Sequence, residues 1–359
     1  MEQKTPRDYT HQVSVGGVTL GGGAPVRVQS MLTAPTKDAL ACLEQINSLV
    51  ENGCELVRAA IPSSSALEGF SEICKESPIP VIADIHFDYR LAVAAAQNGA
   101  AALRINPGNI GSWEKVNAVI DAAKQASIPI RIGINAGSLS AEVSSRQDLT
   151  LPQKMVECAK DYVDHFIKAG FDDIVLSAKA HDVLITVETY RELSRKLPSI
   201  PLHLGITEAG TKLQGTIKSS VGLGMLLAEG IGDTLRVSLT AEPKDELPVA
   251  WGILQALGLR RRGAELISCP TCARCRVNLF DLAQQVEERL QTLRLPISVA
   301  VMGCEVNGPG EAKNADIGVA CGLRSGTLFA HGEILRQIPE ESIVDELFKE
   351  IALRFNNRP

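Results

Sequence analysis

Two stretches in the last quarter of the chain carry the residue types best suited to metal chemistry. The stretch SCPTCARC places Cys269, Cys272 and Cys275 within seven positions, and GCEVNGPGE supplies Cys304 and Glu311. Closely spaced thiolates joined by a distant one ligate either a structural Zn²⁺ ion or an iron–sulfur cluster. The spacing alone leaves both kinds of site open.

The residues around these cysteines favour the iron–sulfur site. Pro270 follows the first cysteine, and Asn-Gly-Pro-Gly at 307–310 predicts a tight turn that brings Glu311 towards Cys304. A carboxylate is a labile ligand of iron and leaves an open coordination position when it departs. That property suits a catalytic cluster better than a closed structural zinc site. The C-x₃-C-x₂-C loop of enzymes that cleave S-adenosylmethionine is absent from the sequence.

The remaining cysteines and the composition indicate the cellular compartment and exclude one class of function. We expect the other five cysteines to be small buried hydrophobes; they are Cys42, Cys54, Cys74, Cys158 and Cys321. An odd number of irregularly spaced cysteines, with no export signal or membrane-spanning run, predicts a reducing compartment, the cytoplasm. A net charge of -6 argues against a general nucleic-acid binder.

A second set of chemically capable residues lies inside short apolar runs of the first 240 residues. In VRAAI, LRINPG, IRIGIN and LRVSL an arginine interrupts each run, where an unpaired buried charge is unfavourable. Similar runs end in ADIH and LSAK. The polar residues at these run ends are Arg58, Asp84, His86, Arg104, Asn106, Arg131, Asn135, Ser177, Lys179, His203, Glu208, Arg236 and Ser238.

The elements that position these residues follow a repeated pattern of helix, glycine and short apolar run. Glycines at the helix ends predict left-handed closing residues; the clearest are Gly53, Gly99, Gly170 and Gly230. Eight runs fit buried parallel strands, within 25–31, 51–62, 80–86, 97–108, 129–135, 168–179, 201–207 and 228–239. Clear helices are expected at 38–52, 152–169 and 245–257. Eight such units predict an α/β fold, a (β/α)₈ TIM barrel, with a doubly wound sheet as the alternative.

The ends of the chain add two further expectations. The hairpin at 11–23 is expected to cover the bottom of the barrel, and the basic stretch at 258–263 is expected to be a linker. Beyond it we predict a helix at 277–293, strands at 297–303 and 315–322, and a helix at 341–355. The domains are therefore a barrel over 1–262 and a small α+β iron–sulfur domain over 263–359.

In such barrels the chemistry lies at the carboxyl ends of the strands, so these side chains should meet at one mouth. Four arginines and Lys179 in one mouth favour a strongly anionic ligand, in particular a diphosphate, because guanidinium groups bind phosphate oxygens in a bidentate way.

The sequence also resembles a known family, the bacterial-type 4-hydroxy-3-methylbut-2-enyl diphosphate synthases of the methylerythritol phosphate route to isoprenoids. The resemblance runs from about residue 11 to the C-terminus and includes both cysteine-bearing stretches. Its barrel motifs are ADIHFDYR (83–90), LRINPGNIG (103–111), IRIGINAGSL (130–139), HLGITEAG (203–210) and EGIGDTLRVSL (229–239).

The resemblance implies a specific reaction: two-electron reductive ring opening of methylerythritol cyclodiphosphate, with loss of water, to hydroxymethylbutenyl diphosphate. It implies a [4Fe–4S] cluster held by Cys269, Cys272, Cys304 and Glu311. Asn135 and Glu208 match residues near the reacting carbons. The residues that match diphosphate ligands are Arg58, Arg104, Arg131, Lys179, Arg236 and Ser238. It further implies flavodoxin or ferredoxin as electron donor, and a homodimer whose sites are each shared by two subunits.

Two residues depart from the family pattern. Cys275 stands where no cysteine is expected, and we interpret it as a bystander rather than a fourth cluster ligand. His181 replaces a small hydroxyl residue and receives no role. The alternative function is a zinc-stapled barrel that binds a phosphorylated metabolite without redox chemistry; such a site would prefer Cys275 and be indifferent to loss of Glu311.

Overall fold

The structure, a computed structural model, describes residues 4–305 and 312–355 of the 359 in the chain. It contains two compact units, Met1–Arg260 and Arg261–Pro359, and each is described by itself below. No helix in the described ranges is both long and apolar enough to cross a membrane. The predicted Asn-Gly-Pro-Gly turn and Glu311 lie outside the described residues.

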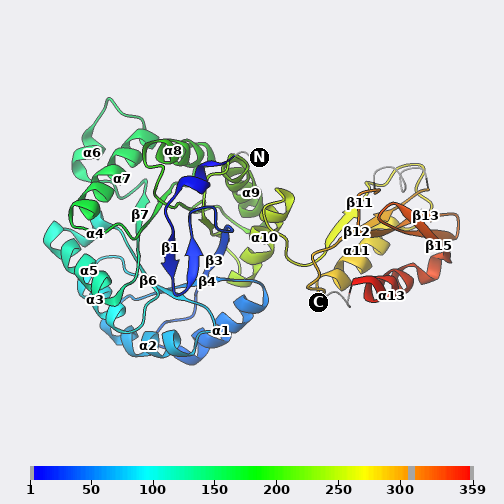
Figure 1. Ribbon diagram of the computed structural model, residues 1–359, viewed down its shortest axis with the longest axis horizontal. Helices are drawn as coiled ribbons and strands as arrows, with labels where there is room; N and C mark the ends of the chain where they lie inside the picture. Colours follow the sequence, from blue (N-terminus) through cyan, green and yellow to red (C-terminus); the bar gives the residue numbers. More distant parts are fainter. Residues whose placement is uncertain (1–3, 306–311, 356–359) are drawn as a thin grey trace. The chain divides into compact units, whose positions relative to one another are not determined.

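The first unit is a parallel eight-stranded barrel, as the sequence predicts (Figure 1). Hydrogen bonds connect the strands in the order β8-β7-β6-β5-β4-β3-β10-β9, and a parallel bridge from Leu176 to Leu202 links the two ends of that order. The strands are β3 (Arg27–Met31), β4 (Leu56–Ala60), β5 (Val81–Asp84), β6 (Ala102–Ile105), β7 (Ile130–Asn135), β8 (Ile174–Lys179), β9 (His203–Leu204) and β10 (Thr234–Leu235).

Helices form a ring outside these strands (Figure 1). They are α1 (Ala39–Glu51), α2 (Leu67–Glu76), α3 (Tyr89–Gln97), α4 (Pro107–Ile110), α5 (Trp113–Ala126), α6 (Ala141–Ser145), α7 (Leu151–Lys168), α8 (Val183–Lys196), α9 (Lys212–Ala228) and α10 (Glu246–Ala256). The glycines predicted to close four of them have φ values of 71–93°, which an L side chain rarely adopts; they are Gly53, Gly99, Gly170 and Gly230.

The hairpin of β1 (Val13–Val15) and β2 (Val18–Leu20) closes the bottom of the barrel, where the sequence places it. It is a separate two-stranded sheet and not a ninth barrel strand. Its buried side chains Val13, Val15 and Leu20 form one apolar cluster with residues of four barrel strands, which are Leu56, Ile82, Ala102 and Val175. The amino-terminal end of the barrel interior is therefore apolar and filled.

The barrel interior becomes polar towards the carboxyl ends of the strands. Because side chains alternate along a strand, Arg131 points inward while its neighbours Ile130 and Ile132 pack outward in the main core. In β8 the same alternation carries the inward series from Val175 through Ser177 to Lys179. On β8, four residues along the strand thus separate the apolar cluster beneath the barrel from a charged side chain.

The second unit is a five-stranded mixed sheet in the order β11-β12-β13-β14-β15. Its strands are β11 (Glu265–Ser268), β12 (Ser298–Met302), β13 (Ile317–Gly322), β14 (Ser325–Ala330) and β15 (Glu333–Pro339). Helices α11 (Leu279–Leu290) and α13 (Ile343–Phe355) pack on it through one apolar cluster. The sequence pattern missed β11, β14 and β15; β15 exposes most of its residues, so it lacks the apolar alternation that identifies strands.

Candidate functional site

The mouth of the barrel gathers the five cations that the sequence places at strand ends. Arg58 lies in β4, Arg104 in β6, Arg131 in β7 and Lys179 at the end of β8, while Arg236 directly follows β10. Arg104 pairs in register with Asp84 on one side and Arg131 on the other. Both arginines are more than nine-tenths buried, so their charges must be compensated within the barrel.

Asp84 supplies part of that compensation. Its carboxylate is 1% exposed and lies 3.4 Å from Arg58 Nε, 3.1 Å from Arg104 Nη1 and 3.6 Å from His86 Nε2. Burial opposes ionisation of this carboxyl group, but Arg58 and Arg104 outweigh burial and lower its pKa. Asp84 is therefore an ionised bridge between two arginines.

Arg236 is held by a carboxylate that the sequence analysis did not single out. Glu246, at the start of α10, accepts hydrogen bonds from Arg236 Nε at 3.2 Å and Nη2 at 3.1 Å. The thioether of Met31 lies between Arg236 and Arg58, 3.3 Å from Arg236 Nη1 and 2.7 Å from Arg58 Nη2. Five cations therefore face two buried carboxylates, which leaves the mouth electropositive.

Arg131 lies one layer deeper, beside two buried neutral groups. Its Nη1 donates to Gln29 Oε1 at 2.6 Å, and its Nε and Nη2 have no hydrogen-bond partner among the described residues. The fully buried His203 hydrogen-bonds Thr234 Oγ1 through Nδ1. Burial, then the charges of Arg131 and Lys179, lower the pKa of His203 well below its usual value, so this imidazole is neutral.

The excess of positive charge at the mouth has a clear effect on the pKa of Lys179. Burial, and then the fields of Arg58, Arg131, Arg236 and Arg104, lower its pKa well below the usual value for lysine. Clustered cations that disfavour one another's charged forms are stabilised by a bound anion. The mouth thus has the electrostatics of an anion site.

Two glycines make room for these cations. A Cβ on Gly133 in β7 would lie 2.6–2.9 Å from the Nε, Nη2 and Cζ atoms of Arg104, and one on Gly205 would lie 2.6 Å from Lys179 Nζ. Both distances are below van der Waals contact. The side chains of Arg104 and Lys179 therefore occupy space that only glycine leaves open.

We expect Gly133→Ala to weaken binding of the anionic ligand while the barrel stays folded. Gly133 has no strained backbone angle, so the added methyl group acts through Arg104, which its ion pair with Asp84 prevents from moving freely. The displaced Arg104 guanidinium would no longer meet the ligand in its original place, so KM should rise about tenfold. Steady-state kinetics check this, with Gly137→Ala as control, because a Cβ there meets nothing within 4 Å. Equal KM values in the two variants would contradict the expectation.

The other predicted site residues lie at the rim. Asn135 ends β7 and pairs in register with Lys179, and Ser238 lies two residues beyond Arg236; both are half-buried. His86 and Glu208 are exposed. Glu208 has φ = 52°, an uncommon left-handed conformation for a non-glycine residue that often marks functional loops. His181 is exposed, and nothing in the structure explains its difference from the family pattern.

In the second unit, the four clustered cysteines line a single cavity of about 200 Å³, together with Pro270, Arg274 and Gly303. Cys269 and Cys275 are half-buried, Cys272 is exposed and Cys304 is buried. The Gly303 N–H donates to Cys269 Sγ at 3.3 Å, whereas the Cys275 thiol donates to the carbonyl oxygen of Val277 at 3.3 Å. Within the described ranges, no three His, Cys, Asp or Glu side chains are placed to hold a metal ion.

The five remaining cysteines differ from this group. Cys42, Cys54, Cys158 and Cys321 are buried and Cys74 is half-buried, as expected of small hydrophobic side chains. Burial raises the pKa of Cys42 to about 11 and that of Cys54, Cys74 and Cys321 to about 12, so these thiols are unreactive.

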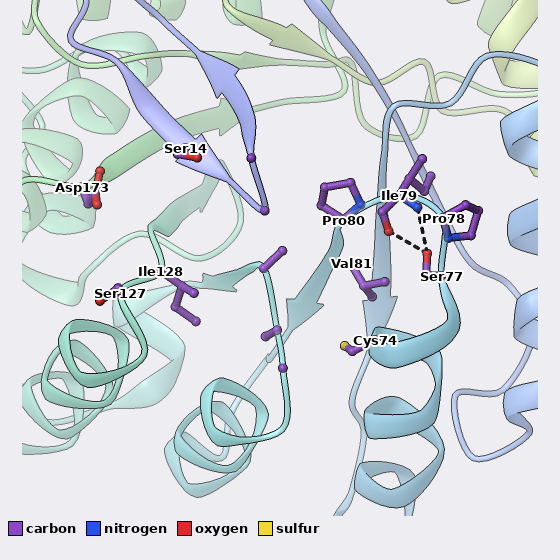
Figure 2. Close-up of a pocket in the computed structure, with 15 residues that line it drawn as sticks. Ser14, Cys74, Ser77, Pro78, Ile79, Pro80, Val81, Ser127, Ile128 and Asp173 are labelled. Atoms are coloured by element: carbon purple, nitrogen blue, oxygen red, sulfur yellow. Dashed lines mark hydrogen bonds between the residues drawn. The ribbon is translucent and has the colours of Figure 1, made fainter.

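A larger hollow, of about 550 Å³, opens at the opposite, amino-terminal end of the barrel (Figure 2). Its wall includes Ser14 of the hairpin, Ser77, Pro78 and Pro80 before β5, and Asp173 before β8. No lysine or arginine lines it. This end of a (β/α)₈ barrel contributes to stability rather than to chemistry, so the hollow is not the candidate site.

Comparison with known proteins shows the family of this chain. Residues 10–251 match the family model described as "GcpE TIM-barrel domain", and residues 265–353 match the one described as "GcpE protein C-terminal domain". The chain belongs to the GcpE family. This confirms the resemblance noted in the sequence, because GcpE relatives carry the name 4-hydroxy-3-methylbut-2-en-1-yl diphosphate synthase (flavodoxin).

Two of these GcpE relatives show how far the similarity extends. The protein from Geobacter sulfurreducens is 52% identical over 95% of this chain and 97% of its own length. The protein from Clostridium acetobutylicum is 49% identical over 96% of this chain and 99% of its own. A solved dihydropteroate synthase from Stenotrophomonas maltophilia has a TM-score of 0.53 at 14% identity, over 69% of this chain and 98% of that one, and supports the barrel fold alone.

Proposed function

We propose that this protein reductively opens the ring of 2-C-methyl-D-erythritol 2,4-cyclodiphosphate and eliminates water to form 4-hydroxy-3-methylbut-2-enyl diphosphate in isoprenoid biosynthesis. The reaction takes up two electrons and two protons, breaks a ring C–O bond and releases one water molecule. The name shared by its GcpE relatives supports this function. The observation in this chain that carries it is the cluster of five cations around two carboxylates at the barrel mouth.

In this proposal the barrel mouth binds the diphosphate. Arg58, Arg236 and Lys179 offer donors nearest the rim, and Ser238 adds a hydroxyl group beside Arg236. Arg104 and Arg131 contribute mainly through their charge, because they are more deeply buried. Bound phosphate oxygens favour the charged form of Lys179 and so oppose the effect of burial and of the neighbouring arginines on its pKa.

Asn135 and Glu208 are proposed to act at the carbon skeleton of the substrate. Asn135 projects from the carboxyl end of β7 next to Lys179, where an amide can orient hydroxyl groups beside a bound diphosphate. Glu208 is the candidate proton donor, because its carboxyl group lies at the rim in a constrained loop conformation. His86, whose Nε2 lies 3.6 Å from Asp84 Oδ2, is exposed at the rim, where it is proposed to contact the substrate.

The cysteine cavity is proposed to hold the redox cofactor, a [4Fe–4S] cluster ligated by Cys269, Cys272, Cys304 and Glu311, the last of which lies outside the described residues. The cavity suits such a group, because thiols from two separate segments line it and the Gly303 N–H already donates to the Cys269 sulfur. A cluster of this kind, when bound, supplies single electrons at low potential, which side chains cannot do. The Cys275 thiol, which donates to a backbone carbonyl, is proposed to be a bystander.

The electron donor is proposed to be flavodoxin, as the names of the relatives indicate, with ferredoxin as the second candidate. The nine cysteines, none of them in a disulfide, support the further proposal of a reducing, cytoplasmic location.

We also propose a homodimer in which each site combines the barrel of one subunit with the cysteine-bearing unit of the other. Helix α9 carries an apolar stripe of Leu213, Ile217 and Val221 at four-residue spacing, and these side chains are 69%, 51% and 50% exposed. An exposed apolar stripe of this kind supports contact with a second subunit.

Ile217→Glu is expected to separate the dimer, because a charge in the centre of the stripe must be desolvated on association. Light scattering should give twice the chain mass for the wild-type protein and the mass of a single chain for the variant. Leu40→Glu, at a similarly exposed leucine of α1, should stay dimeric. A wild-type protein that is monomeric throughout would contradict the homodimer.

The proposed reaction is tested by turnover. The reconstituted protein, supplied with reduced flavodoxin and the cyclic diphosphate, should release hydroxymethylbutenyl diphosphate, which mass spectrometry detects. Consumption of reduced flavodoxin without this product, or no consumption at all, would contradict the proposed function.

A further inference from the structure

Glu246 is a buried carboxylate, and the residues that donate hydrogen bonds to it all lie at or near the barrel mouth. It is 3% exposed, and each of its two carboxylate oxygens accepts two hydrogen bonds. Oε1 accepts from Arg236 Nη2 at 3.1 Å and from the Leu239 N–H at 3.2 Å. Oε2 accepts from Arg236 Nε at 3.2 Å and from Ser30 Oγ at 3.1 Å.

These bonds tie one segment of chain at both of its ends. Strand β10 ends at Leu235, and the Arg236 N–H still donates to the Leu204 carbonyl of β9, so the segment from Arg236 to Leu239 leaves the barrel sheet after its first residue. Glu246 holds the side chain of Arg236 at the start of the segment and the backbone N–H of Leu239 at its end. Through Ser30 it also connects the segment to β3. Ser238 lies between the two tied residues.

We propose that Glu246 is a positioning residue for substrate binding: it fixes the Arg236 guanidinium and the backbone of Ser238 in the geometry that receives the diphosphate. The inference rests on the proposed function and extends it to a residue that touches neither the substrate nor the reacting atoms.

The charges around Arg236 explain why such a residue is needed. Arg236 and Arg58 both contact the Met31 thioether, so the two like charges lie close together. Asp84 holds Arg58, and Glu246 holds Arg236 against the repulsion between them. Without Glu246, Arg236 would rotate away and would have to be immobilised again each time substrate binds.

The positioning role and a simple charge effect predict opposite results for Glu246→Gln. If Glu246 acted only as a negative charge near an anionic ligand, its neutralisation would tighten binding and lower KM. If Glu246 positions Arg236, the glutamine places an amide NH₂ group, which cannot accept a hydrogen bond, against the donor Arg236 Nε. The guanidinium is then released and KM rises. The direction of the change in KM therefore distinguishes the two roles.

The chain offers a matched control at the other end of the barrel. Glu55 is half-buried, less buried than Glu246, and like Glu246 it accepts hydrogen bonds from arginine side chains and a backbone N–H. The donors are Arg27 Nη1, Arg260 Nη1 and Val28 N, at 2.6–2.9 Å. It precedes β4 and lies away from the mouth. Glu55→Gln removes a comparable ion-pair network without disturbing Arg236.

The experiment is a double-mutant cycle on the reconstituted full-length enzyme. Glu246→Gln should raise KM about tenfold and change kcat less than about threefold, and Arg236→Ala should raise KM at least as much. In the double variant, Glu246→Gln should add less than about twofold to the KM of Arg236→Ala, because the two residues act as one unit. Glu55→Gln should leave KM within about twofold of the wild-type value.

Three outcomes would overturn the inference: a lower KM in Glu246→Gln, additive effects in the double variant, or an equal rise in KM for Glu55→Gln. If Glu246→Gln does not fold, Ser30→Ala removes one of the four hydrogen bonds to the carboxylate and should raise KM about threefold, and an unchanged KM would then refute positioning.

A separate arm distinguishes failure of the inference from failure of the proposed function. If the wild-type protein turns over no cyclic diphosphate, the proposed function has failed. The increase in Tm caused by inorganic pyrophosphate then tests positioning alone. This increase should be smaller in Glu246→Gln than in the wild-type and Glu55→Gln proteins, and equal increases in all three would refute the inference.

Discussion

Cys304→Ser is expected to abolish turnover and to remove the visible absorbance of the reconstituted protein. Cys304 is 6% exposed and lines the cavity from a different segment of chain than Cys269 and Cys272, so no neighbouring thiol of its own segment can replace it. A serine hydroxyl is a poor ligand for iron, and a redox enzyme without its cofactor lacks the electron source for C–O cleavage. We expect kcat to fall by about 10³-fold or more.

Cys275→Ser is the matched control, because it makes the same chemical change in the same cavity. The Cys275 thiol donates to the Val277 carbonyl, and a serine hydroxyl can do the same. Iron content, absorbance and turnover should therefore stay close to those of the wild-type protein. Full loss of the cofactor in Cys275→Ser would show that Cys275 is a ligand and that the proposed ligand set is wrong.

The second large effect is expected from Asp84→Asn. The substitution keeps the shape of the side chain but leaves Arg58 and Arg104 without their shared carboxylate. Uncompensated buried charge destabilises a protein by about 3–5 kcal/mol, so Tm should fall by several degrees. A bound anion supplies the missing negative charge, so inorganic pyrophosphate should raise the Tm of this variant by more than it raises that of the wild-type protein.

The pH dependence of stability provides a second measurement on the same variant. The pKa of Asp84 is lowered in the folded protein, so its contribution to stability is fully present above the ordinary pKa of aspartate. That contribution is lost as the pH falls through the lowered value. The free energy of unfolding should therefore depend less on pH in the acid range in Asp84→Asn. A variant as stable as the wild-type protein, with an unchanged response to pyrophosphate, would contradict the ion-pair account of the mouth.

The residues at the barrel mouth could be predicted from the sequence because the fold places them by a simple rule. An arginine inside a short apolar run between helices lies on a buried parallel strand, and the carboxyl ends of such strands meet at one mouth. The structure gathers Arg58, Arg104, Arg131 and Arg236 in this way. The closing glycines and the hairpin beneath the barrel follow from equally local signals.

The residues that hold those arginines could not be predicted in this way. Glu246 looks like an ordinary acidic residue at the start of a helix, where it would stabilise the helix dipole. Its contact with Arg236 depends on how α10 packs against β3 and against the segment that follows β10. Gln29 and Met31 are likewise recognisable only from the alternation of β3, which sets both side chains inside the barrel beside Arg131 and Arg58. The roles of these residues depend on contacts between segments that are far apart in the chain, and a single sequence does not show such contacts.

The proposed function depends most on a redox-active cluster in the cysteine cavity, which would supply electrons to the anion site of the barrel. The most direct test is the visible absorption spectrum of protein purified without oxygen, recorded before and after addition of dithionite. We expect a broad brown absorption band that bleaches on reduction. A colourless protein that contains stoichiometric zinc would contradict it and would leave the zinc-stapled, phosphate-binding barrel as the function of this chain.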